Sequence, residues 1–338
     1  MKLSAFLVML GYIDNMSFEP VFWYRHPHVQ TVFAGKFRRA PIVQYDKERL
    51  ELPDGDFLDI FWKKKPQKEG ALVLLLHGVT GSAQSPYIRA IASVLASKGF
   101  GVAALNFRGA GDMNRKVEAY HAGEIKDLEY VLEHLRKNHP QTPIFAIGFS
   151  LGGSILLNHL GRSSSVLSGA AAVSVPVDLT STAKKLQREF FGIYDRFIVK
   201  ALCRMAQRKW FFLEDMGFSK EVLKARTVWE FDDKITAPVF GFKSAQDYYE
   251  QCSSLPVLSQ ITVPTLLLQS KDDPFLDAPS FPKSDQVSPA VTCLYTQYGG
   301  HVGFVRSPLQ FGSYVEERVV QFINDLLIKV KVHQKVDF

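Results

Sequence analysis

Runs of almost uninterrupted hydrophobic residues alternate with amphipathic stretches along most of the chain. The runs have the length and the Val, Leu, Ile and Ala content of strands buried on both faces, and the stretches between them repeat hydrophobic residues with helical periodicity. The expected strands span residues 71–78, 100–109, 143–150, 168–176, 263–270 and 291–297. The expected helices between them span residues 86–99, 123–140 and 152–161. Strands joined by helices in this way form a parallel sheet covered on both faces. The pattern therefore predicts an α/β fold with a mostly parallel, twisted sheet.

Two segments depart from this alternation. Residues 48–62 alternate hydrophobic and polar side chains around an Asp-Gly turn, which is typical of an antiparallel hairpin at a sheet edge. Residues 179–259 show no buried-strand pattern and are far longer than an ordinary connection, so we expect them to form a helical cap. The α/β core would then comprise residues 48–178 and 260–338, with residues 1–47 packing on it.

The first part of the expected cap is rich in both aromatic and basic residues. Residues 183–212 place Phe, Tyr, Trp, Ile and Leu at helical spacing among many Lys and Arg residues. One interpretation is a cap whose apolar face lies on the body of the protein while its basic face is solvated. The other is a lid whose basic helices also contact an anionic membrane surface. The sequence leaves both interpretations open.

Composition and charge exclude several classes of protein. The chain has 338 residues, 46% of them hydrophobic, which is enough to bury a sizeable core and excludes a disordered protein. The formal net charge is +6 and there is no dense basic tract, so nucleic acid is not an expected partner. Cys203, Cys252 and Cys293 have neither a disulfide pattern nor the spacing of a zinc site, which fits a reducing compartment.

The amino-terminal stretch, residues 1–16, is apolar but lacks most features of a targeting signal. One basic residue precedes its apolar part, no small-residue cleavage site follows, and it is too short to span a bilayer. Met9 and Met16 are alternative starts of the chain. We therefore expect a cytoplasmic protein, peripheral to the inner membrane face if the basic cap helices bind lipid.

The stretch GFSLG at residues 148–152 fits the pattern G-x-S-x-G around Ser150. In α/β hydrolases this pattern forms a sharp turn between a strand and a helix, which holds a serine nucleophile in a strained backbone conformation. Glycines flank the serine because larger residues would collide there. Since the match lies where an expected strand meets an expected helix, Ser150 is the candidate nucleophile.

A serine hydroxyl needs a base to accept its proton and a carboxylate to orient that base. Asp272 and Asp273 follow one expected strand, and His301 lies in a glycine-rich loop after the next. Both loops should lie at the carboxyl edge of the sheet, and the order Ser, Asp, His is the one this fold uses. Asp273 is favoured because Pro274 fixes the turn after it, which leaves Asp272 as an exposed neighbour.

Eight other histidines compete with His301 for the role of base. His77 ends an expected strand, His26 and His28 lie in an amino-terminal loop, and His121 precedes a helix. His301 is favoured because its loop follows both the serine turn and the acidic loop. The other four are expected at the surface of helices or in the tail: His134, His139, His159 and His333.

The loop HGVTGS at residues 77–82 follows an early strand and is suited to binding an oxyanion. The backbone N–H of Val79 would pair there with that of Leu151, the residue after the nucleophile. The same loop is too short for a P-loop and lacks its lysine, and no G-x-G-x-x-G opens the first helix. Nucleotide binding is therefore not expected.

Taken together, these stretches resemble the YheT-like branch of the α/β-hydrolase superfamily, family 4, which includes eukaryotic membrane-associated lipid esterases. The resemblance covers nearly the whole chain and is carried by HPHVQTVF, YHAGE, GFSLGGS, FDDKITAP, KDDPFLD and GGHVGF. It implies Ser150 as nucleophile, Asp273 as the acid and His301 as the base. Two departures, RGAGD in place of RGCGG and Ser154 in place of Asn, remove no catalytic group.

The expected function is hydrolysis of carboxylic esters with short to medium acyl chains, through an acyl-serine intermediate and without a metal or organic cofactor. The substrate would be a small ester or lipid-like molecule whose acyl chain lies among the apolar residues of the cap. Two alternatives stay open. One is an acyltransferase that uses the same three residues, and the other is a non-catalytic binding protein on a hydrolase scaffold.

Overall fold

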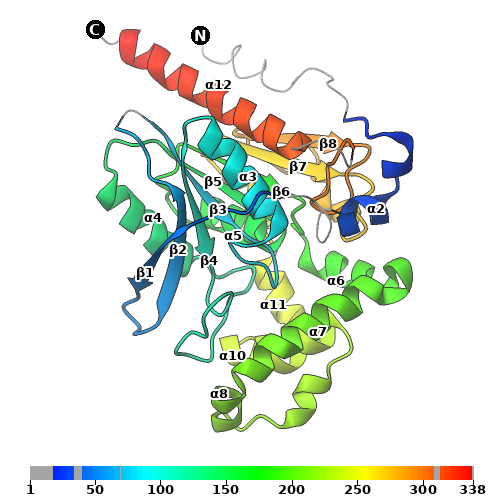
Figure 1. Ribbon diagram of the computed structural model, residues 1–338. Coiled ribbons are helices and arrows are strands. Elements are labelled where there is room, and N and C mark those ends of the chain that lie inside the picture. The colour runs from blue at the N-terminus through cyan, green and yellow to red at the C-terminus, as the bar shows by residue number, and fades with distance from the viewer. Residues whose placement is uncertain (1–17, 34–39, 69, 308–312, 337–338) are drawn as a thin grey trace.

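A single twisted sheet of eight strands forms the centre of the computed structural model, which describes residues 18–33, 40–68, 70–307 and 313–336 (Figure 1). The strands follow the spatial order β1-β2-β4-β3-β5-β6-β7-β8. Their bounds are β1 Asp46–Glu51, β2 Phe57–Lys64, β3 Leu72–Leu76, β4 Gly101–Asn106, β5 Ile144–Phe149, β6 Gly169–Val173, β7 Thr265–Ser270 and β8 Val291–Thr296. The six strands β4, β3, β5, β6, β7 and β8, neighbours in this spatial order, pair in parallel. Each of them lies within a segment that the hydrophobic pattern predicts to be a strand.

The predicted hairpin is also present at the sheet edge. Strands β1 and β2 pair antiparallel on either side of the Asp-Gly turn, and β1 is the outermost strand. β2 pairs antiparallel with β4, which attaches the hairpin to the parallel part of the sheet.

Side chains that alternate along the strands fill two hydrophobic layers. Leu72, Leu74 and Leu76 of β3 enter one layer, while Val73 and Leu75 enter the other, because successive side chains point to opposite faces of a sheet. The first layer is closed by α4 (Lys126–Asn138) and α5 (Leu151–Arg162), and the second by α3 (Pro86–Ser97) and α12 (Tyr314–Val336). The α/β fold with helices on both faces is therefore confirmed.

The segment between β6 and β7 is helical, and we call residues 179–259 the cap. Its α-helices are α6 Leu179–Arg188, α7 Ile193–Arg208, α8 Trp210–Asp215, α9 Val228–Phe231, α10 Ala237–Phe240 and α11 Ala245–Cys252. Short 3-10 and π segments join them or follow them: η4 Glu189–Gly192, η5 Lys220–Lys224, η6 Asp232–Thr236 and η7 Leu255–Gln260. Outside the cap, η2 (Phe22–Tyr24) and α2 (Pro27–Val32) precede the hairpin, and η8 (Ala278–Ser280) follows β7. Figure 1 shows the cap at one end of the sheet, with α2 beside α6.

The apolar residues of the cap do not all face the body of the protein. Ile198 and Val199 of α7 are buried, as expected for the inner face of an amphipathic helix. Phe191 and Phe211, however, are largely exposed, so the expectation that the apolar face as a whole lies on the body is wrong for these aromatic residues. Helical periodicity predicts which side chains share a face, but it does not say what covers that face.

Among the described residues, the structure contains no helix long and apolar enough to cross a membrane. The apolar amino-terminal stretch, residues 1–16, lies outside the described residues.

Candidate active site

Ser150 occupies a sharp turn between the end of β5 and the start of α5. Its backbone has φ 51° and ψ −122°, a left-handed conformation that is unfavourable for a residue with a side chain. Two glycines make the turn possible. A Cβ on Gly148 would lie 2.6 Å from the carbonyl oxygen of Gly152, and a Cβ on Gly152 would lie 2.4 Å from that of His77. The predicted strand-turn-helix geometry around Ser150 is thus present.

The three residues selected from the sequence as nucleophile, base and acid are in contact. His301 Nε2 lies 3.0 Å from Ser150 Oγ, and His301 Nδ1 lies 2.8 Å from Asp273 Oδ2. Asp273 is fully buried, and its other carboxylate oxygen accepts a 2.8 Å hydrogen bond from the backbone N–H of Phe275. A carboxylate held in this way fixes the imidazole with Nδ1 protonated, which leaves Nε2 free to accept the serine proton.

Asp272, expected as an exposed neighbour, is instead partly buried and hydrogen-bonded. Its Oδ1 accepts a 2.9 Å bond from the backbone N–H of Gly300 and a short bond from the Ser270 hydroxyl. Burial raises its pKa above the ordinary value for an aspartate. Asp272 therefore supports the loop that carries His301, while Asp273 contacts the imidazole itself. The expectation was wrong because Asp272 lies against the next loop, a contact that the local sequence does not reveal.

The loop of His301 is held from its other side by α2. The His301 backbone N–H donates a 2.9 Å hydrogen bond to Thr31 Oγ1. Gln30 is fully buried, and its side chain donates to the carbonyl of Val305 and accepts from the N–H of the same residue, at 2.8 and 2.9 Å. A Cβ on Gly300 would lie 2.8 Å from the Gln30 Cβ, so only glycine permits this close packing.

The cap contacts the acid loop directly. Lys185 of α6 donates from Nζ to the carbonyl oxygens of Asp273 and Leu276, at 2.9 and 2.6 Å. The ring of Phe275 stacks on the His301 imidazole with a centroid distance of 4.0 Å. Lys185 therefore fixes the acid loop from the side of the cap, and Phe275, a residue of the acid loop itself, fixes the plane of the imidazole.

The loop after β3 is held by tyrosine hydroxyls and by His77. Tyr120 accepts a 2.9 Å hydrogen bond from the N–H of Thr80, and Tyr87 accepts one of 3.0 Å from the N–H of Gly78. The buried His77 ring bonds the Gly78 carbonyl through Nδ1 and accepts from the N–H of Phe107 through Nε2, at 2.8 and 3.3 Å. Burial lowers the pKa of His77 to about 4, so this ring is neutral and acts as a support rather than as a base.

The backbone N–H groups of Val79 and Leu151 remain for a ligand. Within the described part of the chain, neither group donates to a protein acceptor, although the neighbouring N–H groups of Gly78, Thr80 and Ser150 all do. Val79, Leu151 and Ser150 line one common pocket. Two free donors beside a nucleophile are what an oxyanion site requires.

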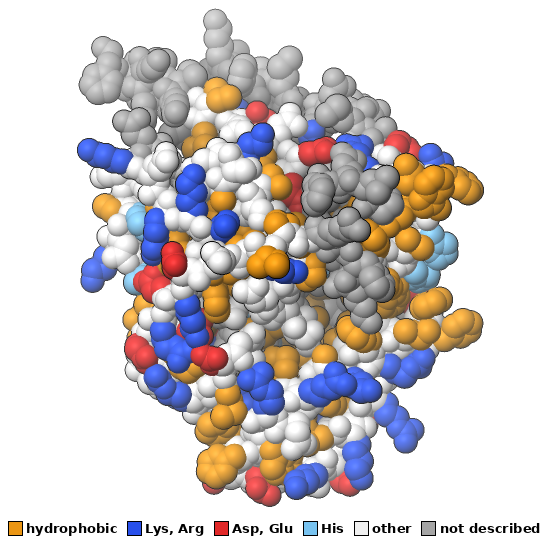
Figure 2. All heavy atoms as spheres, in the orientation of Figure 1, with side chains coloured by type: hydrophobic (Ala, Val, Ile, Leu, Met, Phe, Trp, Pro, Cys, Tyr) orange, Lys and Arg blue, Asp and Glu red, His pale blue; other side chains and the backbone are white. Residues whose placement is uncertain are grey.

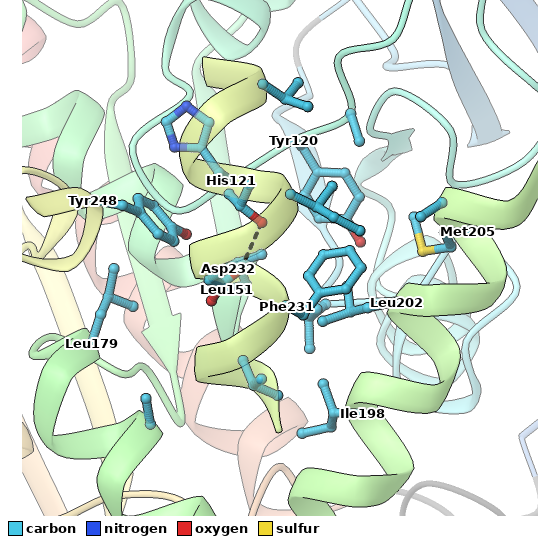
Figure 3. A pocket seen from close by; sticks show the side chains of 18 of the residues that line it. Tyr120, His121, Leu151, Leu179, Ile198, Leu202, Met205, Phe231, Asp232 and Tyr248 are labelled. Carbon is cyan, nitrogen blue, oxygen red and sulfur yellow. Dashed lines mark hydrogen bonds between the residues drawn. The ribbon is translucent and has the colours of Figure 1, made fainter. Parts of the chain in front are cut away.

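A mostly apolar pocket of about 180 Å³ is lined by Ser150 and His301 and by residues of the cap. Figure 3 shows cap side chains such as Leu202 and Phe231 lining it, together with Leu151 of α5. Its lining comes from helices α6 to α11 and η6 of the cap, together with the core loops and the start of α5. Residues of α7 contribute along one stripe of the helix: Ile198, Leu202, Met205 and Ala206. This stripe extends roughly 12 Å along the helix axis, at about 1.5 Å per residue.

A few polar side chains interrupt this apolar lining. Asp232 is buried and accepts hydrogen bonds from the hydroxyls of Tyr249 and Thr236, at 2.7 and 2.6 Å. Burial raises the pKa of Asp232 to about 6. Lys209 lies at the edge of the pocket with its ammonium group bonded to three backbone carbonyls, and burial lowers its pKa to about 8. His121, whose pKa burial lowers to about 4, completes the polar side of the pocket.

His28, His121 and His159 make contacts of their own rather than bonding the Ser150 hydroxyl. His28 contacts Tyr194 and Phe190 of the cap, and His121 lies among cap aromatic rings. His159, expected at the surface, is buried and bonds the hydroxyl of Ser165, so that expectation is wrong. In the described part of the chain, no cluster of His, Cys, Asp or Glu side chains is arranged to hold a metal ion.

Several residues near the site were not singled out from the sequence. Gln30 and Thr31 belong to HPHVQTVF, Tyr120 to YHAGE and Asp232 to FDDKITAP. All these stretches carry the resemblance to the YheT-like branch but contain no catalytic residue. The structure places each stretch beside the site. Thr31 bonds the loop that carries His301, Tyr120 bonds the loop after β3, and Asp232 lines the pocket.

Comparison with known proteins agrees with the geometry. Residues 71–308 match the family described as the alpha/beta hydrolase fold. The chain is 34% identical over 323 residues to YheT of Escherichia coli (strain K12), a protein provisionally named an esterase, covering 93% of this chain and 95% of that protein. It is 28% identical over 326 residues to the human phospholipase ABHD3, covering 92% of this chain and 79% of that protein.

Solved structures show the same architecture. The esterase Pf2001 of Pyrococcus furiosus superposes with a TM-score of 0.57 at 20% identity, over 84% of this chain and 91% of that protein. Together with the elbow at Ser150 and the sequence matches, this places the chain in the α/β-hydrolase family, within its YheT-like branch.

Proposed function

We propose that this protein is a serine hydrolase of carboxylic esters with short to medium acyl chains. The observation that carries the proposal is the continuous chain of contacts from Ser150 Oγ to His301 and from His301 to the buried carboxylate of Asp273. A binding protein on the same scaffold would have no need of these contacts at a strained serine.

Each residue has one role in the proposed reaction. His301 Nε2 takes the proton of the Ser150 hydroxyl while Oγ attacks the ester carbonyl carbon, and Asp273 keeps the imidazole in the required tautomer. The N–H groups of Val79 and Leu151 bind the oxyanion, where one donor is typically worth about 10² to 10³ in rate. The protonated imidazole then gives its proton to the leaving alcohol, and an acyl-serine forms.

Water completes the reaction by the same sequence of steps, with water in place of the serine hydroxyl. His301 accepts a proton from a water molecule as the water oxygen attacks the acyl carbonyl carbon. The imidazolium then gives this proton to Ser150 Oγ as the bond between Oγ and the acyl carbon breaks, which releases the carboxylic acid and the free serine. The apolar pocket supports an aliphatic acyl group as the part of the substrate that is buried. Relatives named as a phospholipase and a monoacylglycerol lipase support ester substrates of lipid type.

Turnover of a graded series of p-nitrophenyl esters tests the proposal. The wild type should hydrolyse acetate to medium-chain esters, and Ser150→Ala should lose a factor of about 10⁴ to 10⁶ in kcat. Ser154→Ala is the matched control, because Ser154 lies one turn further along α5 and donates to the carbonyl of Pro176. Equal activity of the wild type and Ser150→Ala would contradict the proposal. Measuring free acid against transfer to an added alcohol separates hydrolysis from acyl transfer.

A further inference from the structure

The short segment between α6 and α7 presents two phenylalanine rings to solvent. Phe191 is 85% exposed and Phe190 is 43% exposed. Both have left-handed backbone angles, with φ 54° and 47°, and Gly192 follows with φ 68°. A left-handed backbone is unfavourable for bulky side chains, and no burial within the described chain offsets it at Phe191. This combination points to a contact with something outside the chain.

The η4 segment contacts α2, and η2, which precedes α2, carries two more exposed rings. The His28 ring of α2 stacks on Phe190 at 4.3 Å, and its Nδ1 lies 2.9 Å from the hydroxyl of Tyr194. Figure 2 shows hydrophobic side chains gathered along this edge of the molecule, where α2 and the start of α7 meet in Figure 1. The aromatic patch is defined by the exposed residues of η2, η4 and the first turn of α7: Phe22, Trp23, Phe190, Phe191 and Ile193.

Basic side chains follow the aromatic patch along the outward face of α7. Arg196, Lys200 and Arg204 are exposed and stand four residues apart, so they share one face of the helix; we call them the basic rim. Asp195, the one acidic residue of α7, is buried and accepts a 2.8 Å bond from the N–H of Val228. The outward face of α7 is therefore positively charged.

Two acidic groups lie beside the aromatic patch. Asp277 forms an ion pair with Arg188 at 3.4 Å. Glu189 lies 3.7 Å from His28 Nε2, but burial lowers the pKa of His28, so this histidine is not a charged partner at neutral pH. Among the described residues, neither carboxylate forms an ion pair with Arg196, Lys200 or Arg204.

We propose that the aromatic patch and the basic rim dock onto an anionic lipid bilayer. Exposed Phe and Trp rings insert at the boundary between headgroups and acyl chains, and Lys and Arg side chains bind the phosphates beside them. The opposite face of α7 lines the pocket of Ser150, through Ile198 and Leu202. The docked cap thus lies between the bilayer and the pocket. The inference stands independently of the ester chemistry, because it concerns only the outer surface of the cap.

Sedimentation of the full chain with vesicles tests the docking. Phosphatidylcholine vesicles that contain phosphatidylglycerol should bind the protein strongly at low salt and more weakly as salt rises, and vesicles of phosphatidylcholine alone should bind it weakly. Phe190→Ser/Phe191→Ser should lower the partition coefficient at least about tenfold, because two apolar rings no longer insert. The matched control is Ile328→Ser, which removes an exposed apolar side chain from α12, away from the cap.

A second pair of variants tests the charge. Arg196→Gln/Lys200→Gln should weaken binding about 30-fold, since each basic residue near an anionic surface contributes about fivefold. Lys126→Gln/Lys137→Gln on α4 lowers the net charge equally at a distance from the cap and should have little effect. Circular dichroism and hydrolysis of a water-soluble ester confirm that each variant is folded and separate loss of docking from loss of catalysis.

Three outcomes would overturn the inference. They are absence of binding to the anionic vesicles at low salt, equal binding by the cap variants and their controls, and a concentration-dependent dimer that Phe190→Ser/Phe191→Ser dissociates while vesicle binding is unchanged. The last outcome would assign the aromatic patch to contact with a second copy of the chain.

Discussion

The carboxyl edge of the sheet and the cap both contact the pocket, but they do so with different kinds of interaction. At the sheet edge, hydrogen bonds hold Ser150, Asp273 and His301 in place. Close backbone packing, which only glycine allows, holds the turns that carry them. The cap contributes mainly apolar side chains, such as Leu202 of α7. Hydrogen bonds fix positions closely, whereas apolar contacts tolerate changes of shape. Under the proposed function, the sheet edge carries out the reaction, whereas the cap selects the substrate and contacts the lipid surface.

Replacing the acid should have the largest effect. Asp273→Asn should reduce kcat by about 10⁴, because the asparagine favours the wrong tautomer of His301. Asp272→Asn should cost only about tenfold, since Asp272 bonds the backbone of Gly300 and not the imidazole. Steady-state hydrolysis of one ester by both variants gives the comparison. An equal loss in Asp272→Asn with none in Asp273→Asn would assign the acid to Asp272.

Replacing the buried carboxyl group of Asp232 in the cap should change how the free energy of unfolding depends on pH. Burial raises the pKa of Asp232 to about 6, from an ordinary value of 3.8. Between these two values the unfolded chain has lost the proton while the folded chain retains it, so folding stability falls as pH rises, by about 3 kcal/mol in total. Asp232→Asn has no proton to lose at this position, so its folding stability should not fall in this way. Between about pH 4 and pH 7 the variant should therefore become more stable relative to the wild type by about 3 kcal/mol.

Urea unfolding at several pH values measures this difference. The control variant Asp215→Asn removes an exposed carboxylate of α8 and should leave the pH profile unchanged. Parallel profiles for the wild type and Asp232→Asn would show that Asp232 ionises normally in the folded protein.

Filling the pocket from α7 should change selectivity without changing the chemistry. Leu202→Phe should lower kcat/KM for medium-chain esters about 10- to 100-fold relative to acetate, because the larger ring occupies space for the acyl chain. Ala201→Leu adds volume to the same helix at a residue that does not line the pocket, and it should leave the ratio unchanged. If Leu202→Phe lowered activity on all esters equally, the acyl chain would have to bind elsewhere.

Loss of the bond from α2 should have the smallest effect on rate. Thr31→Val keeps the shape of the side chain but removes the acceptor for the His301 N–H, which should lower kcat about tenfold. KM should stay unchanged, since Thr31 positions the base and does not touch substrate. Thr31→Ser restores the acceptor and should recover most of the rate. An unchanged kcat in Thr31→Val would show that the loop keeps its position without α2.

The contact among Ser150, Asp273 and His301 could be predicted from sequence because the signals of these residues are local. Ser150 lies in a five-residue pattern at the junction of a strand and a helix, and Asp273 and His301 follow strands whose ends share one sheet edge. Contacts between distant segments leave no such signal. Thr31 reaches a loop 270 residues away, so its role becomes visible only in the fold. The exposure of Phe191 depends on a left-handed backbone that helical periodicity does not encode.

Labelling with a fluorophosphonate, followed by mass mapping of the adduct, tests most directly whether Ser150 is an activated nucleophile. Such a probe reacts with a serine whose proton is taken by an adjacent base. The adduct should lie on Ser150 in the wild type, be absent from Ser150→Ala and form much more slowly in Asp273→Asn. An adduct on another residue, or equal labelling of the wild type and Ser150→Ala, would contradict the assignment of Ser150, His301 and Asp273.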